Sequence, residues 1–96
     1  MHTNTLRVRQ LRELLVLIEE FDAGWEVFVS RGTLNSEGRK VCVRIGTLAG
    51  HLFPGTPFKV RWVLGDASDT HVRSALEAIR DKATAELEHL EWRSPQ

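Results

Sequence analysis

Apolar and basic residues alternate along residues 58–64, Phe-Lys-Val-Arg-Trp-Val-Leu. Alternation with period two is typical of a strand that buries one face. Residues 25–30 and 39–45 show the same alternation. In a strand over residues 39–45, one side would carry Val41, Val43 and Ile45, and the other side would carry Lys40, Cys42 and Arg44. The pattern predicts three strands, over residues 25–30, 39–45 and 58–64.

Helical spacing of apolar residues marks both ends of the chain. Apolar residues recur at three- and four-residue intervals over residues 7–21 and again over residues 69–91. The two stripes consist of Val8, Leu11, Leu14, Leu15, Ile18 and Phe21, and of Val72, Leu76, Ile79, Ala83, Leu87 and Leu90. Gly24 is expected to cap the first helix in a left-handed conformation. Arg73 with Glu77, and Lys82 with Glu86, are expected to form ion pairs along the second.

The order helix, strand, strand, strand, helix predicts a single α+β domain over residues 1–96. Short connections between strands favour an antiparallel meander, and one apolar side per strand favours both helices on one face of the sheet. Residues 31–38 and 46–57 are rich in turn formers and are expected to be loops.

Composition points to an ordinary globular protein. Of 96 residues, 13 are Lys or Arg and 13 are Asp or Glu, so no net charge attracts nucleic acid or a membrane surface. The single cysteine, Cys42, forms no intramolecular disulfide. The longest apolar run, residues 14–18, is far below the length of a membrane span, and no signal peptide is recognisable. We therefore expect a cytoplasmic protein that does not enter the membrane.

Candidate catalytic and metal-binding residues are scattered. His2, His51, His71 and His89 lack the spacing of a metal site, so no metal is expected. The glycines of residues 46–55 lack the Gly-Lys-Ser/Thr ending of a phosphate loop. The serines lack the context of a nucleophile elbow. The sequence thus predicts no enzyme and no cofactor.

The face of the predicted sheet opposite the helices would concentrate positive charge. It would carry Phe28, Lys40, Arg44, Lys59 and Arg61. Basic residues beside an aromatic ring suit an anionic partner such as single-stranded nucleic acid. The alternative is a solvent-facing sheet that uses cationic side chains for solubility. This alternative is favoured because a single aromatic residue is a poor platform for stacking bases.

A second candidate surface would mediate self-association. Val16 and Leu17 lie off the main stripe of the first helix, and Leu90 and Trp92 lie near the end of the second. Apolar residues that the domain does not cover are a candidate dimer contact. The alternative for Val16 is a single exposed valine, which is common.

Two resemblances accompany these patterns. The predicted element order resembles that of double-stranded RNA-binding domains, but residues 66–71, Asp-Ala-Ser-Asp-Thr-His, stand where that family carries a lysine cluster. Residues 6–15 and 21–29 are similar to the opening of small uncharacterised proteins of actinobacteria and their phages. The departure from the first family argues against binding of duplex RNA, and the second resemblance implies no activity.

The sequence therefore predicts a small non-enzymatic module that binds a protein partner or a second copy of itself, or acts as an adaptor, of phage or defence-system origin. The alternative is a nucleic-acid-binding module that uses the basic face of the sheet. Retention of nucleic acid across a salt series distinguishes these two functions.

Overall fold

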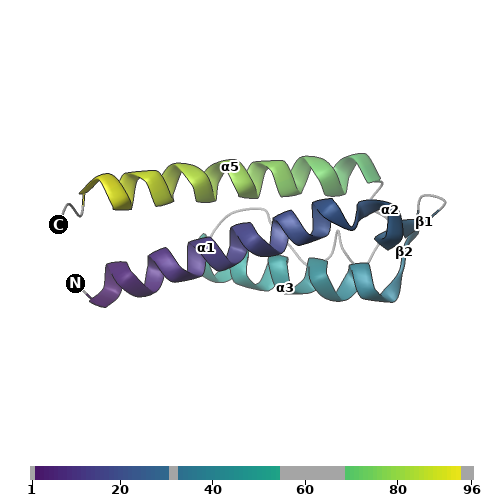
Figure 1. Ribbon diagram of the computed structural model, residues 1–96, viewed down its shortest axis with the longest axis horizontal. Coiled ribbons are helices and arrows are strands. Elements are labelled where there is room, and N and C mark those ends of the chain that lie inside the picture. Colours follow the sequence, from purple (N-terminus) through teal and green to yellow (C-terminus); the bar gives the residue numbers. More distant parts are fainter. Residues whose placement is uncertain (1, 31–32, 55–68, 94–96) are drawn as a thin grey trace.

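Three long helices form the body of the protein in the computed structural model, which describes residues 2–30, 33–54 and 69–93 (Figure 1). The elements are α1 (His2–Ala23), α2 (Trp25–Phe28), β1 (Val29–Ser30), β2 (Thr33–Leu34), α3 (Ser36–Leu52) and α5 (Asp69–Arg93). Helix α1 runs antiparallel to both α3 and α5, and the start of α1 lies at the same end of the molecule as the end of α5. The architecture is all-α, so the predicted α+β class is wrong.

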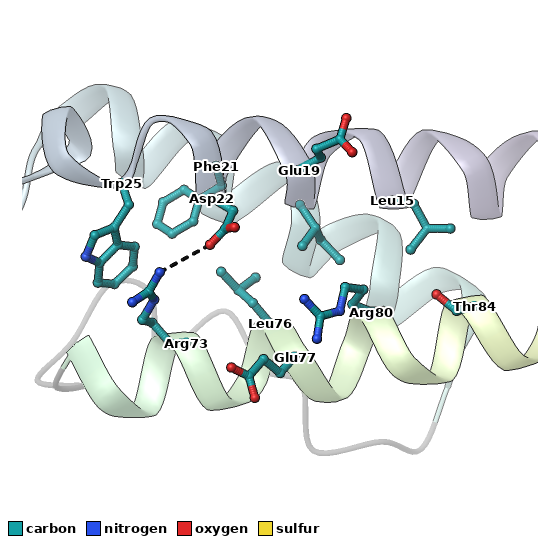
Figure 2. A pocket seen from close by; sticks show the side chains of 11 residues that line it. Leu15, Glu19, Phe21, Asp22, Trp25, Arg73, Leu76, Glu77, Arg80 and Thr84 are labelled. Atoms are coloured by element: carbon teal, nitrogen blue, oxygen red, sulfur yellow. Dashed lines mark hydrogen bonds and ion pairs between the residues drawn. The ribbon is translucent and has the colours of Figure 1, made fainter.

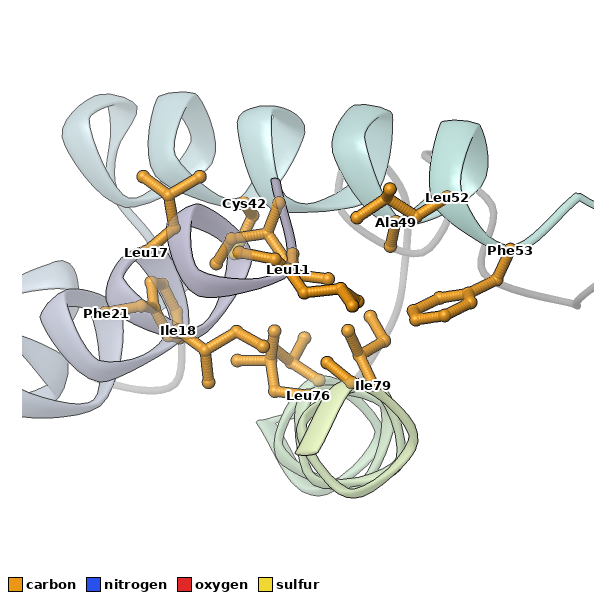
Figure 3. Close-up of a cluster of buried hydrophobic side chains, with 14 residues drawn as sticks. Leu11, Leu17, Ile18, Phe21, Cys42, Ala49, Leu52, Phe53, Leu76 and Ile79 are labelled. Carbon is orange, nitrogen blue, oxygen red and sulfur yellow. The ribbon is translucent and has the colours of Figure 1, made fainter. Parts of the chain in front are cut away.

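The hydrophobic core lies where α1, α3 and α5 meet (Figure 3). Helix α1 supplies Leu11, Leu14, Leu17, Ile18 and Phe21; α3 and the residue after it supply Cys42, Ile45, Ala49, Leu52 and Phe53; and α5 supplies Val72, Leu76, Ile79 and Ala83. No polar or charged side chain is buried in the part of the chain that the structure describes. Apolar packing therefore holds the three helices together.

Residues 39–45 belong to helix α3, and the strand predicted there is wrong. The buried positions follow a helical period, because they are Gly38, Cys42, Ile45, Gly46, Ala49 and Leu52. Cys42, which the strand pattern placed on the outer side with Lys40 and Arg44, lies in the core instead. The two basic residues are exposed one helical turn apart. Most of the predicted loop 46–57 that is described also lies in this helix, up to Leu52.

Asn35 starts helix α3. Its side chain accepts a hydrogen bond from the backbone N–H of Gly38 at 2.8 Å, which satisfies one of the amide groups left free at a helix start. Gly38 itself sits under α2: a Cβ there would lie 2.8 Å from Cβ of Phe28 and 3.1 Å from Cδ1 of Leu34. This glycine therefore permits close packing inside a helix and does not mark a loop.

The strand predicted at residues 25–30 is mostly the single helical turn α2. The N–H of Phe28 donates to the carbonyl of Gly24 at 2.8 Å, and only β1 continues as extended chain, pairing antiparallel with β2. Gly24 has φ −95°, so it is not the left-handed cap that we predicted. The helical turn brings the ring of Trp25 edge-on to Phe21 and stacks Phe28 on Phe21, both at 5.5 Å between centroids.

These corrections also remove the likeness to double-stranded RNA-binding domains, which rested on a three-stranded sheet. The one sheet present among the described residues pairs two residues with two. The third predicted strand, residues 58–64, lies outside the described residues. Helices do occupy both ends of the chain, and α1 and α5 contain the predicted ranges 7–21 and 69–91.

Candidate binding groove

A groove of about 390 Å³ runs between α1 and α5, with α3 behind them (Figure 2). Hereafter it is called the α1/α5 groove. Its lining comes from the facing sides of the two helices and the start of α2, and consists of Leu15, Ile18, Glu19, Phe21, Asp22, Trp25, Arg73, Leu76, Glu77, Arg80 and Thr84. The lining of α5 repeats at three- and four-residue intervals, which is the spacing of one helical face.

The floor of the groove is apolar. Ile18, Phe21 and Leu76 belong to the buried core, while Leu15 and Trp25 are only partly covered. Charged side chains of both helices form the rim above this floor. A hydrophobic floor with a polar rim is typical of a surface that accepts the apolar face of a partner.

Arg73 closes one end of the groove. Its guanidinium lies 4.5 Å from the centroid of the Trp25 ring, and its Nη2 donates to Oδ1 of Asp22 at 3.3 Å (Figure 2). Both charged side chains are more than half exposed, so the ion pair contributes little to stability. Its effect is to hold the guanidinium over the indole and to fix the position of the Trp25 side chain.

The remaining rim charges are not balanced. Arg80 pairs with Asp81 at 3.6 Å. Glu19 and Glu77, on opposite rims, form no ion pair with any residue of the described ranges. Figure 2 shows both carboxylates directed away from the floor. The rim therefore offers negative charge to a partner.

Two further ion pairs join α1 to α5 nearer the chain ends. Arg12 pairs with Glu91 at the surface, beyond the Leu15–Thr84 end of the groove. Arg7 pairs with Glu86 and also donates to the carbonyl of Leu52 at 2.8 Å, where α3 ends. The hydrogen bond to Glu86 raises the pKa of Arg7, so this cation is held more firmly in its charged form. These contacts fix the two walls of the groove relative to each other.

The structure separates the residues of the predicted basic face. Lys40 and Arg44 are exposed on α3, where they border a shallow hollow with Arg39 and Val43. Phe28 is half-buried against Phe21 and belongs to a different surface. Lys59 and Arg61 lie outside the described residues. The predicted sheet face is therefore not formed by the described residues of this set. Arg39, Lys40 and Arg44 are instead exposed along α3.

The predicted self-association surface is also divided. Val16 is 52% exposed on α1, but Leu17 is only 5% exposed and contributes to the core. Leu90 is half-buried against the core. The side chain of Trp92 is outside the described part of the chain. Among the described side chains of this set, Val16 is thus the one that is largely exposed and free to meet a partner.

Cys42 is 0% exposed, and burial raises the pKa of its thiol to about 12. A neutral thiol without access to solvent is a poor nucleophile. Within residues 2–30, 33–54 and 69–93, no group of three His, Cys, Asp or Glu side chains is placed to hold a metal ion. Over the same ranges, no helix is both long enough and apolar enough to cross a membrane.

The sequence interpretation did not identify the α1/α5 groove. It paired Arg73 with Glu77 and Lys82 with Glu86 along one helix, whereas Arg73 pairs with Asp22 and Glu86 with Arg7, both across helices. The available signal was the repeat of polar residues Arg73, Glu77, Arg80 and Thr84 along one side of the second helix. That repeat marks a face but does not say which helix it meets.

Comparisons with known proteins give no further guide to this groove. Neither a protein-family model, nor a curated protein, nor a solved structure matches the chain. The functional argument therefore rests on the geometry and charge of the helices themselves.

Proposed function

We propose that this protein is a small non-enzymatic binding module whose α1/α5 groove holds an apolar segment of a partner protein. The observation that carries the proposal is the partly uncovered apolar floor, with Leu15 and Trp25 beneath a charged rim. Tryptophan and arginine, which meet at one end of the groove, are the residue types that contribute most often to binding energy in protein interfaces.

The rigidity of the groove supports this function. Both walls are long helices that share one core, and ion pairs join them toward both ends of the groove. A surface built on packed helices changes little when a partner binds, so less free energy is spent on ordering it. The groove is therefore suited to binding a segment that itself becomes ordered on contact.

Binding of a synthetic helical peptide to wild-type protein and to two variants tests the proposal. The peptide has about twelve residues, a leucine stripe and uncharged flanks, and its binding is followed by fluorescence anisotropy. Leu15→Gln places a polar amide on the floor and should weaken binding about five- to tenfold, a typical loss for an interface contact of about 1 kcal/mol. Val16→Gln makes the same chemical change at the neighbouring, exposed position outside the groove lining and should leave binding unchanged.

Equal binding to wild type and both variants would contradict the proposal, as would the absence of binding to wild type. Thermal unfolding of each variant checks that Leu15→Gln remains folded. If Val16→Gln weakens binding more than Leu15→Gln, the peptide contacts the outer side of α1 and not the groove, and the proposal fails. A second copy of the chain is then the alternative occupant of that side.

A second candidate function is binding of nucleic acid through α3. The observation that favours it is the row of exposed cations Arg39, Lys40 and Arg44. Lys40 also lies 3.8 Å from Glu37, which reduces the net charge of the row. Binding of single-stranded DNA or RNA that weakens steeply with salt, and that is lost on charge reversal of Lys40 and Arg44, would establish this function in place of the first.

A further inference from the structure

The dimensions of the α1/α5 groove define what it can hold. At about 1.5 Å of rise per residue, the wall of α5 from Arg73 to Thr84 is about 16 Å long, which equals about three turns of α-helix. An antiparallel helix pair presents a trough along its length, and a further helix fills such a trough by placing its side chains between theirs. Helix α3 packs on α1 in this way behind the groove.

The charges on the rim define the chemistry of the occupant. Both arginines of the lining already have acidic neighbours, Asp22 for Arg73 and Asp81 for Arg80. Glu19 and Glu77 stand on opposite walls and form no ion pair with a basic residue of the described ranges. A helix lying on the floor between the walls would place the residues beside its apolar stripe next to these two carboxylates.

We infer that the groove binds a basic amphipathic helix of about three turns from a partner protein. Its apolar stripe lies on Leu15, Ile18 and Leu76, and lysine or arginine residues on the two sides of the stripe face Glu19 and Glu77. This inference rests on the proposed function and adds the length and the charge of the partner segment to it. Complementary charge of this kind selects among partners and speeds their association.

Two peptides that differ only in their flanking charges test the inference. Both have the length and leucine stripe of the uncharged peptide, and one carries lysine and the other glutamate at the flanking positions. The lysine peptide should bind wild-type protein about tenfold more tightly than the glutamate peptide, because two exposed ion pairs are replaced by two repulsive contacts. The difference should shrink as the salt concentration rises.

A double charge reversal locates this preference on the rim. Glu19→Lys with Glu77→Lys should reverse the order of the two peptides. The matched control, Glu13→Lys with Glu20→Lys, makes the same change in net charge at exposed positions of α1 outside the groove lining. This control should keep the preference for lysine, reduced only slightly, because the more positive net charge weakens binding of the lysine peptide and strengthens binding of the glutamate peptide.

The outcomes separate this inference from the proposed function. If the peptides bind equally, or the glutamate peptide binds better, while Leu15→Gln still weakens binding, the basic helix is wrong and the groove remains a protein-binding site. If Leu15→Gln affects none of the peptides, both are wrong. If the control reversal abolishes the preference as fully as the groove reversal does, net charge explains the preference and the inference fails. Dimerisation of the free protein that Leu15→Gln abolishes, with no binding of the lysine peptide to the dimer, would assign the groove to a second copy and overturn the inference.

Discussion

At the scale of single residues, Cys42 reports the orientation of α3. A strand would have turned this thiol toward solvent with Lys40 and Arg44, whereas the helix buries it completely. Burial raises the pKa of the thiol from 9.0 to about 12, because the thiolate loses its hydration. The ionisation of this one group therefore differs between the folded and unfolded chain.

This difference predicts how stability depends on pH. As the pH rises through 9.0, the unfolded chain loses the thiol proton while the folded protein keeps it until about pH 12. The contribution of Cys42 is therefore fully present below the unfolded pKa and is lost as the pH rises from 9.0 toward the folded pKa of about 12, by about 1.4 kcal/mol per pH unit. Urea unfolding of wild type and Cys42→Ala at increasing pH measures the effect. The wild type should lose stability faster than the variant in alkaline solution, and parallel pH profiles would show that the thiol is exposed.

At the scale of elements, Asn35 decides where α3 begins. Its side chain accepts from the N–H of Gly38 at 2.8 Å and donates to the carbonyl of Val27 at 2.9 Å, so it joins the start of α3 to the end of α2. Asn35→Ala should lower the free energy of unfolding by about 1–2 kcal/mol, as expected for a lost N-cap. Ser36→Ala, at the exposed next position, should change it by less than about 0.5 kcal/mol. Chemical denaturation that finds the two variants equally stable would show that Asn35 is not the cap.

The same helix shows why part of the fold could be predicted and part could not. The ends of the chain carry long apolar stripes at helical spacing, and these identified α1 and α5 from the sequence. Over residues 39–45, alternating Val41, Val43 and Ile45 fit a strand, while the spacing of Cys42 and Ile45 fits a helix. Only the continuation to Ala49 and Leu52 separates the two periods. Gly46 and Gly50 interrupt that continuation and suggested a loop, because glycine lowers helix propensity by about 1 kcal/mol.

Packing against α1 outweighs that propensity. Gly46 is buried, whereas Gly50 is exposed and has nothing within 4 Å of the position of a Cβ. Neither glycine ends the helix, because α3 continues to Leu52. The groove was harder to predict than α3. Its ion pair joins Asp22 to Arg73, which lie far apart in the chain, and a pattern within one helix contains no information on such pairs.

At the scale of the whole molecule, α1 is the centre of the arrangement. It packs against α3 and α5 through one shared core. Outside this core, the side of α1 that faces α5 forms one wall of the groove. The α1/α5 groove combines an apolar floor with two carboxylates, of Glu19 and Glu77, that form no ion pair within the described residues. We propose that a partner binds in the α1/α5 groove and not along the cations of α3.

Amide chemical-shift mapping tests this proposal most directly, with the isotope-labelled 96-residue chain and the lysine-flanked peptide. We predict that the largest shifts fall on the groove lining, at Leu15, Glu19, Glu77 and Thr84, together with the indole N–H of Trp25. The amides of Arg39, Lys40 and Arg44 should remain nearly unchanged. Shifts concentrated on α3, with the groove lining unaffected, would contradict the claim.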